Sequence, residues 1–469
     1  MVFASLFFLF VFLPLNLILY YSSKNPVYRN ALLTLFSLWF YAWGEPVWIV
    51  LLLFSAVVDW GNGIFIEKYR GTQWARLGLV SSAIVNLGLL VIFKYSAFIY
   101  ENLNALFGLN LEVPHFALPI GISFYSFQTL SYVIDVYRGE VKAQRSYGKF
   151  LLFVSLYHQL VAGPIVRYAH IAHEIDNRKF DIRDISEGIS RFCFGLFKKI
   201  CIANVAGELV AKYLDGDMGS LSVMGGWFGI IMFTLQIYFD FSGYSDMAIG
   251  LGRMFGFHYH ENFNYPYTAR SATDFWRRWH ISLGSFFRDY LYIPLGGNRS
   301  NMYRNLFIVW FLTGLWHGAS WNFIFWGLYF GILIALERMF LQKVLDALPR
   351  VVSHLYLLSA AVLGWALFYF TDLGRLGEFL SIIFGASGHA YWDLATVIVL
   401  KEHVFWLIFS VIICMPVYHV VMNWIRKRMT EDSAVYYRYA FMSVDFVILF
   451  MTTAMLVGRS YNPFLYYRF

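Results

Sequence analysis

Long apolar runs alternate with short polar loops along the whole chain. A run of about 20 residues with few charges is long enough to cross a bilayer as a helix. The first run, residues 1–21, lacks the basic start and the small-residue cleavage site of a signal peptide, so we expect it to stay as a first helix. Later crossing helices are expected at residues 119–137, 185–214, 223–252, 352–371, 403–425 and 440–457.

The charged residues of the loops indicate an orientation. Lys24 and Arg29 follow the first run, whereas the loop at 101–118 contains two glutamates and no Lys or Arg. Cytoplasmic loops are enriched in Lys and Arg, so the first of these loops is expected inside and the second outside. Applied to the whole chain, with the basic run 426–428 before the last helix, this rule places both termini outside.

Two apolar stretches do not fit a simple crossing. Residues 150–165 are short, end in Gly-Pro and have basic loops on both sides, which indicates a re-entrant segment. Residues 306–340 are too long for one crossing and too short for two. We expect them to form a bent pair of half-helices that turns at 313–318 and carries His317 into the membrane.

Composition supports an integral membrane protein. Hydrophobic residues make up 59% of the 469 residues and charged residues 14%, which is unlike a soluble enzyme of this length. The net charge of +7 comes from scattered loop clusters and indicates membrane topology, not a nucleic-acid partner. With no repeat or soluble linker in the sequence, we treat residues 1–469 as a single domain. The three cysteines, Cys193, Cys201 and Cys414, lie in apolar segments and are expected to be buried core residues, not metal ligands or a disulfide framework.

Two histidines are the candidate proton-handling groups. His280 and His317 each stand beside a tryptophan in apolar surroundings, where polar side chains are costly and usually functional. The helix expected at 223–252 also carries Asp240 and Asp246, so we expect it to face a cavity.

Three separated motifs carry a resemblance to a known family. They are QIYFDFSGYSDMAIG at 236–250, DFWRRWHISL at 274–283 and TGLWHGASWNF at 313–323. In this order they resemble the membrane-bound O-acyltransferase (MBOAT) family, and within it the alginate O-acetyltransferase branch, which is close to the peptidoglycan O-acetyltransferases and the D-alanyl transfer proteins. The resemblance covers nearly the whole length, with its core at 236–322. It implies an all-α polytopic membrane protein, a helical ring around a central funnel with re-entrant and broken helices.

The resemblance also implies roles for individual residues. His317 would be the catalytic base, since a neutral imidazole suits acyl transfer to a hydroxyl, and His280 a second active-site residue. Arg277 and Arg278 would either bind donor phosphates or anchor the membrane interface. The expected donor substrate is acetyl-CoA, with no permanently bound cofactor and no metal. The other expected substrate-binding or bracing residues are Trp316, Asn322, Asp240 and Asp246.

The C-terminal segment 464–469, FLYYRF, resembles a motif associated with carrying an acyl group on tyrosine. Tyr466 would then be a covalent relay; an interfacial aromatic tail is the alternative. The expected partners are membrane lipid, an extracellular or periplasmic SGNH-type acyltransferase and a polysaccharide acceptor. The expected function is O-acetylation of an alginate-like exopolysaccharide from the bacterial cytoplasmic membrane. Peptidoglycan acetylation, a transporter or acyl channel, and a recruiting scaffold stay open as alternatives.

Overall fold

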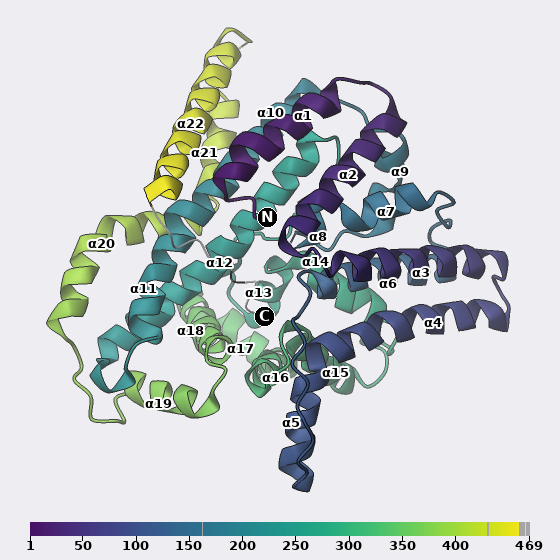
Figure 1. Ribbon diagram of the computed structural model, residues 1–469. Coiled ribbons are helices and arrows are strands. Elements are labelled where there is room, and N and C mark those ends of the chain that lie inside the picture. The colour runs from purple at the N-terminus through teal and green to yellow at the C-terminus, as the bar shows by residue number, and fades with distance from the viewer. Residues whose placement is uncertain (162, 429–430, 459–464, 466–469) are drawn as a thin grey trace. The chain divides into compact units, whose positions relative to one another are not determined.

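The computed structural model describes residues 1–161, 163–428, 431–458 and residue 465. Every regular element in these residues is a helix, as Figure 1 shows. Within this described part of the chain, seven helical stretches are long and apolar enough to cross a membrane: Ile49–Lys68, Gln73–Phe107, Val223–Met254, Trp321–Ala347, Arg350–Tyr369, Leu394–Ile413 and Tyr439–Gly458. The all-α polytopic fold predicted from the sequence is confirmed.

The chain divides into two compact units that interleave along the sequence. The first comprises Met1–Phe192 and Tyr244–Glu261, and the second comprises Cys193–Gly243 and Asn262–Phe469. The helix α12 (Val223–Met254) is therefore divided between them: its residues up to Gly243 belong to the second unit, and those from Tyr244 onward belong to the first.

The first unit contains mostly long apolar helices and short connecting ones. In chain order they are η1 (Phe8–Phe12), α1 (Leu13–Tyr21), α2 (Pro26–Gly44), α3 (Ile49–Lys68), α4 (Gln73–Leu90), η2 (Val91–Tyr95), α5 (Ser96–Phe107), α6 (Ile122–Arg138), α7 (Tyr147–Ser155), α8 (Tyr157–Leu160), α9 (Tyr168–Asp176) and α10 (Ile182–Phe197), whose last residues belong to the second unit. The short helices α7 and α8 occupy the segment interpreted as re-entrant. At about 1.5 Å per residue neither helix is long enough to cross a bilayer.

A buried carboxylate joins α3, α4 and α6, and Figure 1 shows α3 and α4 side by side. Asp59 of α3 accepts hydrogen bonds from the Ser82 hydroxyl (2.5 Å) and the Asn86 amide (2.8 Å) of α4. The Thr129 hydroxyl of α6 donates to the Asn86 carbonyl oxygen at 3.2 Å. These bonds satisfy polar groups that would be costly to leave unpaired in an apolar interior.

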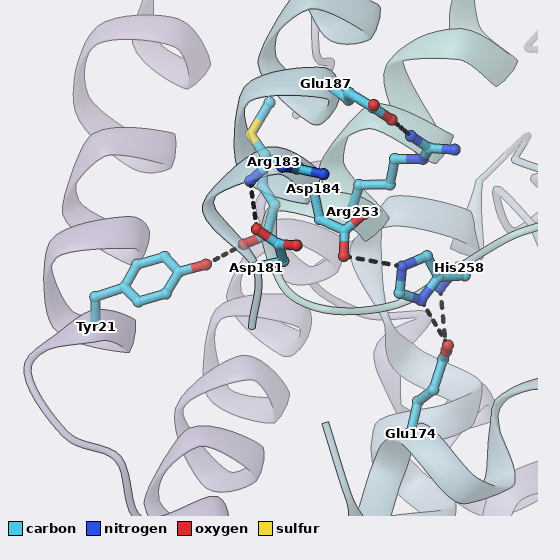
Figure 2. Close-up of polar contacts among 9 residues, drawn as sticks. Tyr21, Glu174, Asp181, Arg183, Asp184, Glu187, Arg253 and His258 are labelled. Atoms are coloured by element: carbon cyan, nitrogen blue, oxygen red, sulfur yellow. Dashed lines mark hydrogen bonds and ion pairs between the residues drawn. The ribbon is translucent and has the colours of Figure 1, made fainter. Parts of the chain in front are cut away.

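Charged contacts tie α9, α10 and the end of α12 together within the first unit (Figure 2). His258 lies between Glu174 and Asp184, with its Nδ1 2.8 Å from the first carboxylate and its Nε2 3.3 Å from the second. Arg253 pairs with Glu187 in the same region. These groups are partly exposed, so each contact contributes little stability singly, but together they fix the loop that follows α12.

The second unit begins at Cys193, within α10. Its elements are η3 (Lys198–Ala203), α11 (Asn204–Leu214), η4 (Met218–Ser220), the start of α12, η5 (Pro266–Thr268), α13 (Ala272–Arg278), α14 (Ile281–Phe287), η6 (Arg288–Tyr292), α15 (Met302–His317), α16 (Trp321–Leu336), η7 (Glu337–Leu341), α17 (Gln342–Ala347), α18 (Arg350–Tyr369), α19 (Leu373–Ile383), α20 (Leu394–Ile413), α21 (Val417–Arg426) and α22 (Glu431–Gly458). Its core is aromatic-rich, and the largest fully buried side chains in it are Trp326 and Trp365.

Three boundaries differ from the sequence-based expectations. The loop expected at 101–118 begins later, because α5 continues to Phe107 and ends at Gly108, which adopts the left-handed conformation that favours glycine. The crossing expected at 403–425 is wrong: α20 spans Leu394–Ile413, and Pro416 separates it from α21. Lys401 and Glu402 lie inside α20, although the expected crossing began at residue 403.

The pair of helices expected at 306–340 is present, but its second arm is not a half-helix. The turn falls after His317, as expected. The second arm continues through Glu337 to Ala347, which gives it 27 residues, enough for a full crossing. The three cysteines are buried, as expected.

Candidate active site

His317 is the last residue of α15, in a tight hairpin with α16. Two glycines allow the helices to approach closely: a Cβ at Gly314 would lie 2.3 Å from the Phe323 carbonyl oxygen, and one at Gly327 would lie 2.3 Å from the Trp310 carbonyl oxygen. Any larger residue would push the helices apart. The hairpin therefore fixes the position of His317 through its backbone.

Aromatic rings surround the imidazole of His317. Its ring centroid lies 4.9 Å from Trp316, 4.8 Å from Trp326 and 5.4 Å from Phe368, all in edge-on geometry. The side chain is 7% exposed. A cavity lies against the ring, and its lining residues are Ile237, Asp240, Phe241, Trp279, His317, Trp326, Trp365, Phe368 and Leu465.

His280 lies between α13 and α14 in a strained backbone conformation. Its φ of 45° and ψ of 56° are left-handed, which costs a non-glycine residue about 1–2 kcal/mol. Such strain persists only where the surrounding structure enforces it, and it occurs preferentially at functional sites. The conformation directs the His280 side chain into the protein, where it is 1% exposed.

The hydrogen bonds of His280 define its tautomer. Its Nδ1 lies 3.2 Å from the side-chain oxygen of Asn262, which only accepts, so Nδ1 carries the proton. Its Nε2 then has a lone pair, and no described residue donates to it. Burial lowers the pKa of His280 to about 3, so the ring is neutral at pH 7.

The two histidines come together through Trp316. The ring of Trp316 lies 6.1 Å from that of His280 and 4.9 Å from that of His317. Phe241 also contacts His280, at 4.7 Å between ring centroids, and lines the cavity beside His317. Residues 37 positions apart in the sequence thus form one aromatic cluster.

Asp240 lies at the same cavity and contacts Lys199 and Leu465. Its Oδ1 is 2.6 Å from the ammonium nitrogen of Lys199, and its Oδ2 accepts a hydrogen bond from the backbone N–H of Leu465 at 2.8 Å. Leu465 is 5% exposed and lines the cavity with His317. Tyr466, the predicted relay, lies outside the described residues.

The adjacent arginines of α13 have different surroundings. Arg278 donates from Nε to Asp274 at 2.9 Å, one helical turn earlier. Arg277 is exposed and forms no ion pair with any residue that the structure describes. Of the two, Arg277 is therefore the one available for a donor phosphate.

The N-terminus of α13 is held by a carboxylate from η7. Glu337, 2% exposed, accepts hydrogen bonds from the backbone N–H groups of Ala272 (2.6 Å) and Thr273 (2.8 Å) and from the Thr273 hydroxyl (2.6 Å). Ser271 adds a side-chain cap to the N–H of Asp274. These bonds pair the first N–H groups of the helix and place negative charge where its dipole is positive.

Asn322 and Asp246, both predicted substrate-binding residues, have structural contacts. The side-chain amide of Asn322 donates to the carbonyls of Leu367 (3.2 Å) and Phe368 (3.3 Å), which joins the start of α16 to the end of α18. Asp246 belongs to the first unit, where it pairs with Arg191 at 2.8 Å. Their predicted roles toward substrate stay predictions.

Sequence reasoning missed three polar residues of this site. Lys199 was given no role, and Asn262 and Glu337 were not singled out. Each is at most 4% exposed. The sequence offered one signal for a role of these residues, namely a polar side chain in or beside an apolar run, where burial is costly. Among the described residues, no group of three or more His, Cys, Asp or Glu side chains is arranged to hold a metal.

Comparisons with known proteins identify relatives of this chain. Residues 140–377 match the profile of MBOAT, the membrane-bound O-acyltransferase family. The chain is 42% identical over 405 residues to a probable alginate O-acetylase of Azotobacter vinelandii, covering 84% of this chain and 80% of the relative. It is 44% identical over 383 residues to the probable alginate O-acetylase of Pseudomonas putida, covering 78% and 77%.

A third relative is named for a different polymer. The peptidoglycan O-acetyltransferase of Helicobacter pylori is 35% identical over 418 residues, covering 81% of this chain and 79% of the relative. The profile match spans the aromatic cluster around His280 and His317. The chain is thus an acyltransferase and belongs to the membrane-bound O-acyltransferase family.

Proposed function

We propose that the protein transfers an acetyl group from cytoplasmic acetyl-CoA to Tyr466, for delivery to an extracellular polysaccharide. One observation carries the proposal: Leu465, the residue before Tyr466, lines the same cavity as His317. A base and the chain that bears the acceptor hydroxyl therefore meet at one cavity, which is what direct transfer needs.

The first step uses the imidazole of His317 as the base. It takes the proton of the Tyr466 hydroxyl as the phenol oxygen attacks the acetyl carbonyl of the thioester. The carbon–sulfur bond breaks, and the departing thiolate takes the proton back from the imidazolium as free CoA. His280, whose Nε2 bears a lone pair inside the same aromatic cluster, would orient the donor or the His317 ring through Trp316.

The second step moves the acetyl group onward outside the membrane. A phenol has a pKa near 10 and a thiol near 8.5, so a tyrosyl ester keeps much of the transfer potential of the thioester. A hydroxyl of the polymer attacks this ester, and Tyr466 is released for another cycle. An extracellular or periplasmic SGNH-type acyltransferase partner would catalyse this transfer. The proposed location is the bacterial cytoplasmic membrane, and the basic run 426–428 before the last helix supports a C-terminus on the outer side.

The proposed acceptor is an alginate-like exopolysaccharide. The relatives at 42% and 44% identity are named as probable alginate O-acetylases. Peptidoglycan is the second candidate, supported by the relative at 35% identity. Both use the same chemistry on a sugar hydroxyl, so the choice depends on the partner and not on the cavity described here.

Mass spectrometry of the purified protein after incubation with acetyl-CoA tests the relay. An adduct of one acetyl group should appear on Tyr466, and it should be absent from Tyr466→Phe and His317→Ala. If wild type acetylates polymer while no adduct forms on Tyr466, the relay is wrong. Ester-linked acetate measured separately in secreted polymer and in peptidoglycan, with and without the gene, distinguishes the two acceptors.

A further inference from the structure

A buried ion pair connects the helical segment before α11 to the middle of α12. Lys199 of η3 and Asp240 of α12 are 2.6 Å apart, with side chains 6% and 2% exposed. Removing two charges from water costs several kcal/mol per ion, and their attraction does not always offset that cost. Apolar residues of similar volume would often hold two helices equally well, so stability alone is a weak reason for this pair.

The carboxylate of this pair also binds the C-terminal segment of the chain. While Asp240 Oδ1 faces Lys199, Oδ2 accepts the backbone N–H of Leu465 at 2.8 Å. The bond joins residues 225 positions apart. Because the donor is a backbone group, the bond depends on where the tail lies and not on its side chain at this position.

The ion pair makes this acceptor strong and fixes its direction. A hydrogen bond to an ionised acceptor is about twice as strong as one between neutral groups. Lys199 holds one oxygen of Asp240, and the other oxygen accepts the N–H of Leu465. Without the Leu465 N–H, this buried carboxylate oxygen would lose its donor, which is unfavourable.

We propose that Lys199 and Asp240 form a latch that holds Leu465 at the His317 cavity. Tyr466 follows Leu465 directly in the sequence, so in this proposal holding Leu465 restricts the position of the acceptor. Lys199 and Asp240 are thus positioning residues for the acceptor. The purpose of the latch depends on the function proposed above, whereas its existence does not.

Hydrogen exchange of the Leu465 amide measures the latch directly. Three full-length proteins are compared with wild type: Lys199→Met/Asp240→Leu, which removes charge and acceptor; Lys199→Met/Asp240→Asn, which removes charge and keeps an oxygen; and Lys198→Met as control. Lys198 is the neighbouring lysine, 5.2 Å from the ring of Phe194. Replacing both charged partners leaves no uncompensated charge, so these variants are expected to fold.

The expected result is a graded loss of protection at Leu465. Exchange should be at least tenfold faster in the Leu double variant, intermediate in the Asn double variant and unchanged in Lys198→Met. Protection of α15 and α16 in the same experiment reports that the fold is intact. If Leu465 exchanges at the wild-type rate in the Leu double variant, the latch does not exist.

The rate at which the acetyl adduct forms on Tyr466 tests the latch and the relay separately. With a latch, the Leu double variant should form the adduct at least tenfold more slowly, with no change in the KM for acetyl-CoA, because donor binding is untouched. A general structural defect would change both. If tail protection depends on Asp240 but wild type forms no adduct, the latch stands and the relay fails. If the adduct forms at the wild-type rate in a variant that lost protection, the positioning role is wrong.

Discussion

The ring of His280 lies 6.1 Å from the ring of Trp316, the residue directly before His317. One indole therefore contacts both histidines, although they come from different helical elements. Groups that share a rigid neighbour in this way are expected to act as a unit, and the loss of either should disable the same step.

This arrangement predicts non-additive losses of activity. His317→Ala should lower acetyl transfer by about 10²- to 10⁴-fold, the usual contribution of a general base. His280→Ala should also lower it, and the double variant should be no less active than His317→Ala alone. Single-turnover release of CoA from acetyl-CoA measures each rate. Multiplicative losses would show that the two histidines act independently, and unchanged membrane abundance controls for folding.

The different surroundings of the two arginines predict different effects on the donor. Arg277→Ala should raise the KM for acetyl-CoA about tenfold, since a hydrogen bond to a charged group contributes about 1.5–3 kcal/mol. It should leave the KM for acetyl-pantetheine, which lacks the nucleotide phosphates, unchanged. Arg278→Ala should change neither by more than about twofold, because it removes a partly exposed pair worth at most about 1 kcal/mol. Equal effects of Arg277→Ala on both donors would exclude a phosphate contact.

The Glu337 cap predicts a loss of stability that also reaches the site. Glu337→Gln replaces one acceptor oxygen with a donor that faces the backbone N–H groups of α13, and should cost about 1–3 kcal/mol. The midpoint of thermal unfolding in detergent measures this. Glu378, an exposed glutamate of α19, provides the control as Glu378→Gln. An unchanged midpoint for Glu337→Gln would mean that the cap contributes no net stability.

The glycine contacts of the hairpin predict strong sensitivity to a single methyl group. Gly314→Ala or Gly327→Ala should destabilise the protein by about 1–3 kcal/mol or more and lower activity, because the new Cβ meets backbone that cannot move aside easily. Gly88→Ala in α4 is the matched control, since a Cβ there meets nothing within 4 Å. Unfolding midpoints and transfer rates of the three variants provide the comparison. A Gly314→Ala protein as active as Gly88→Ala would contradict the close approach.

The sequence predicted the long helices well because their signal is local. The helices observed at Val223–Met254 and Arg350–Tyr369 lie within a few residues of their expected positions. The same local reasoning failed at Lys401 and Glu402. A helix whose other residues are apolar accommodates these two charges, and Pro416 was a better signal for its end than either charge was for its start.

The partners of the polar residues were not predictable in the same way. The histidines were found because each stands in a distinctive motif. Glu337 looked like an interfacial charge, and nothing in the sequence states that it pairs with α13, more than 60 positions earlier. The hydrogen bond between Asp240 and Leu465 joins residues that are even farther apart in the sequence, by 225 positions. Such pairings depend on the tertiary fold, which local pattern does not encode.

The division of α12 between two units affects how the protein is made. The first unit needs residues Tyr244–Glu261 to be complete, yet its earlier part ends at Phe192. At about 5–20 residues per second, the ribosome takes on the order of 3–14 s to synthesise residues 193–261, the stretch whose end completes the first unit. Throughout that interval the nascent amino-terminal helices lack the element that completes their unit. The protein therefore cannot mature strictly from its first residue onward, and membrane insertion factors that shield unfinished helices should be needed most at this stage of its biogenesis.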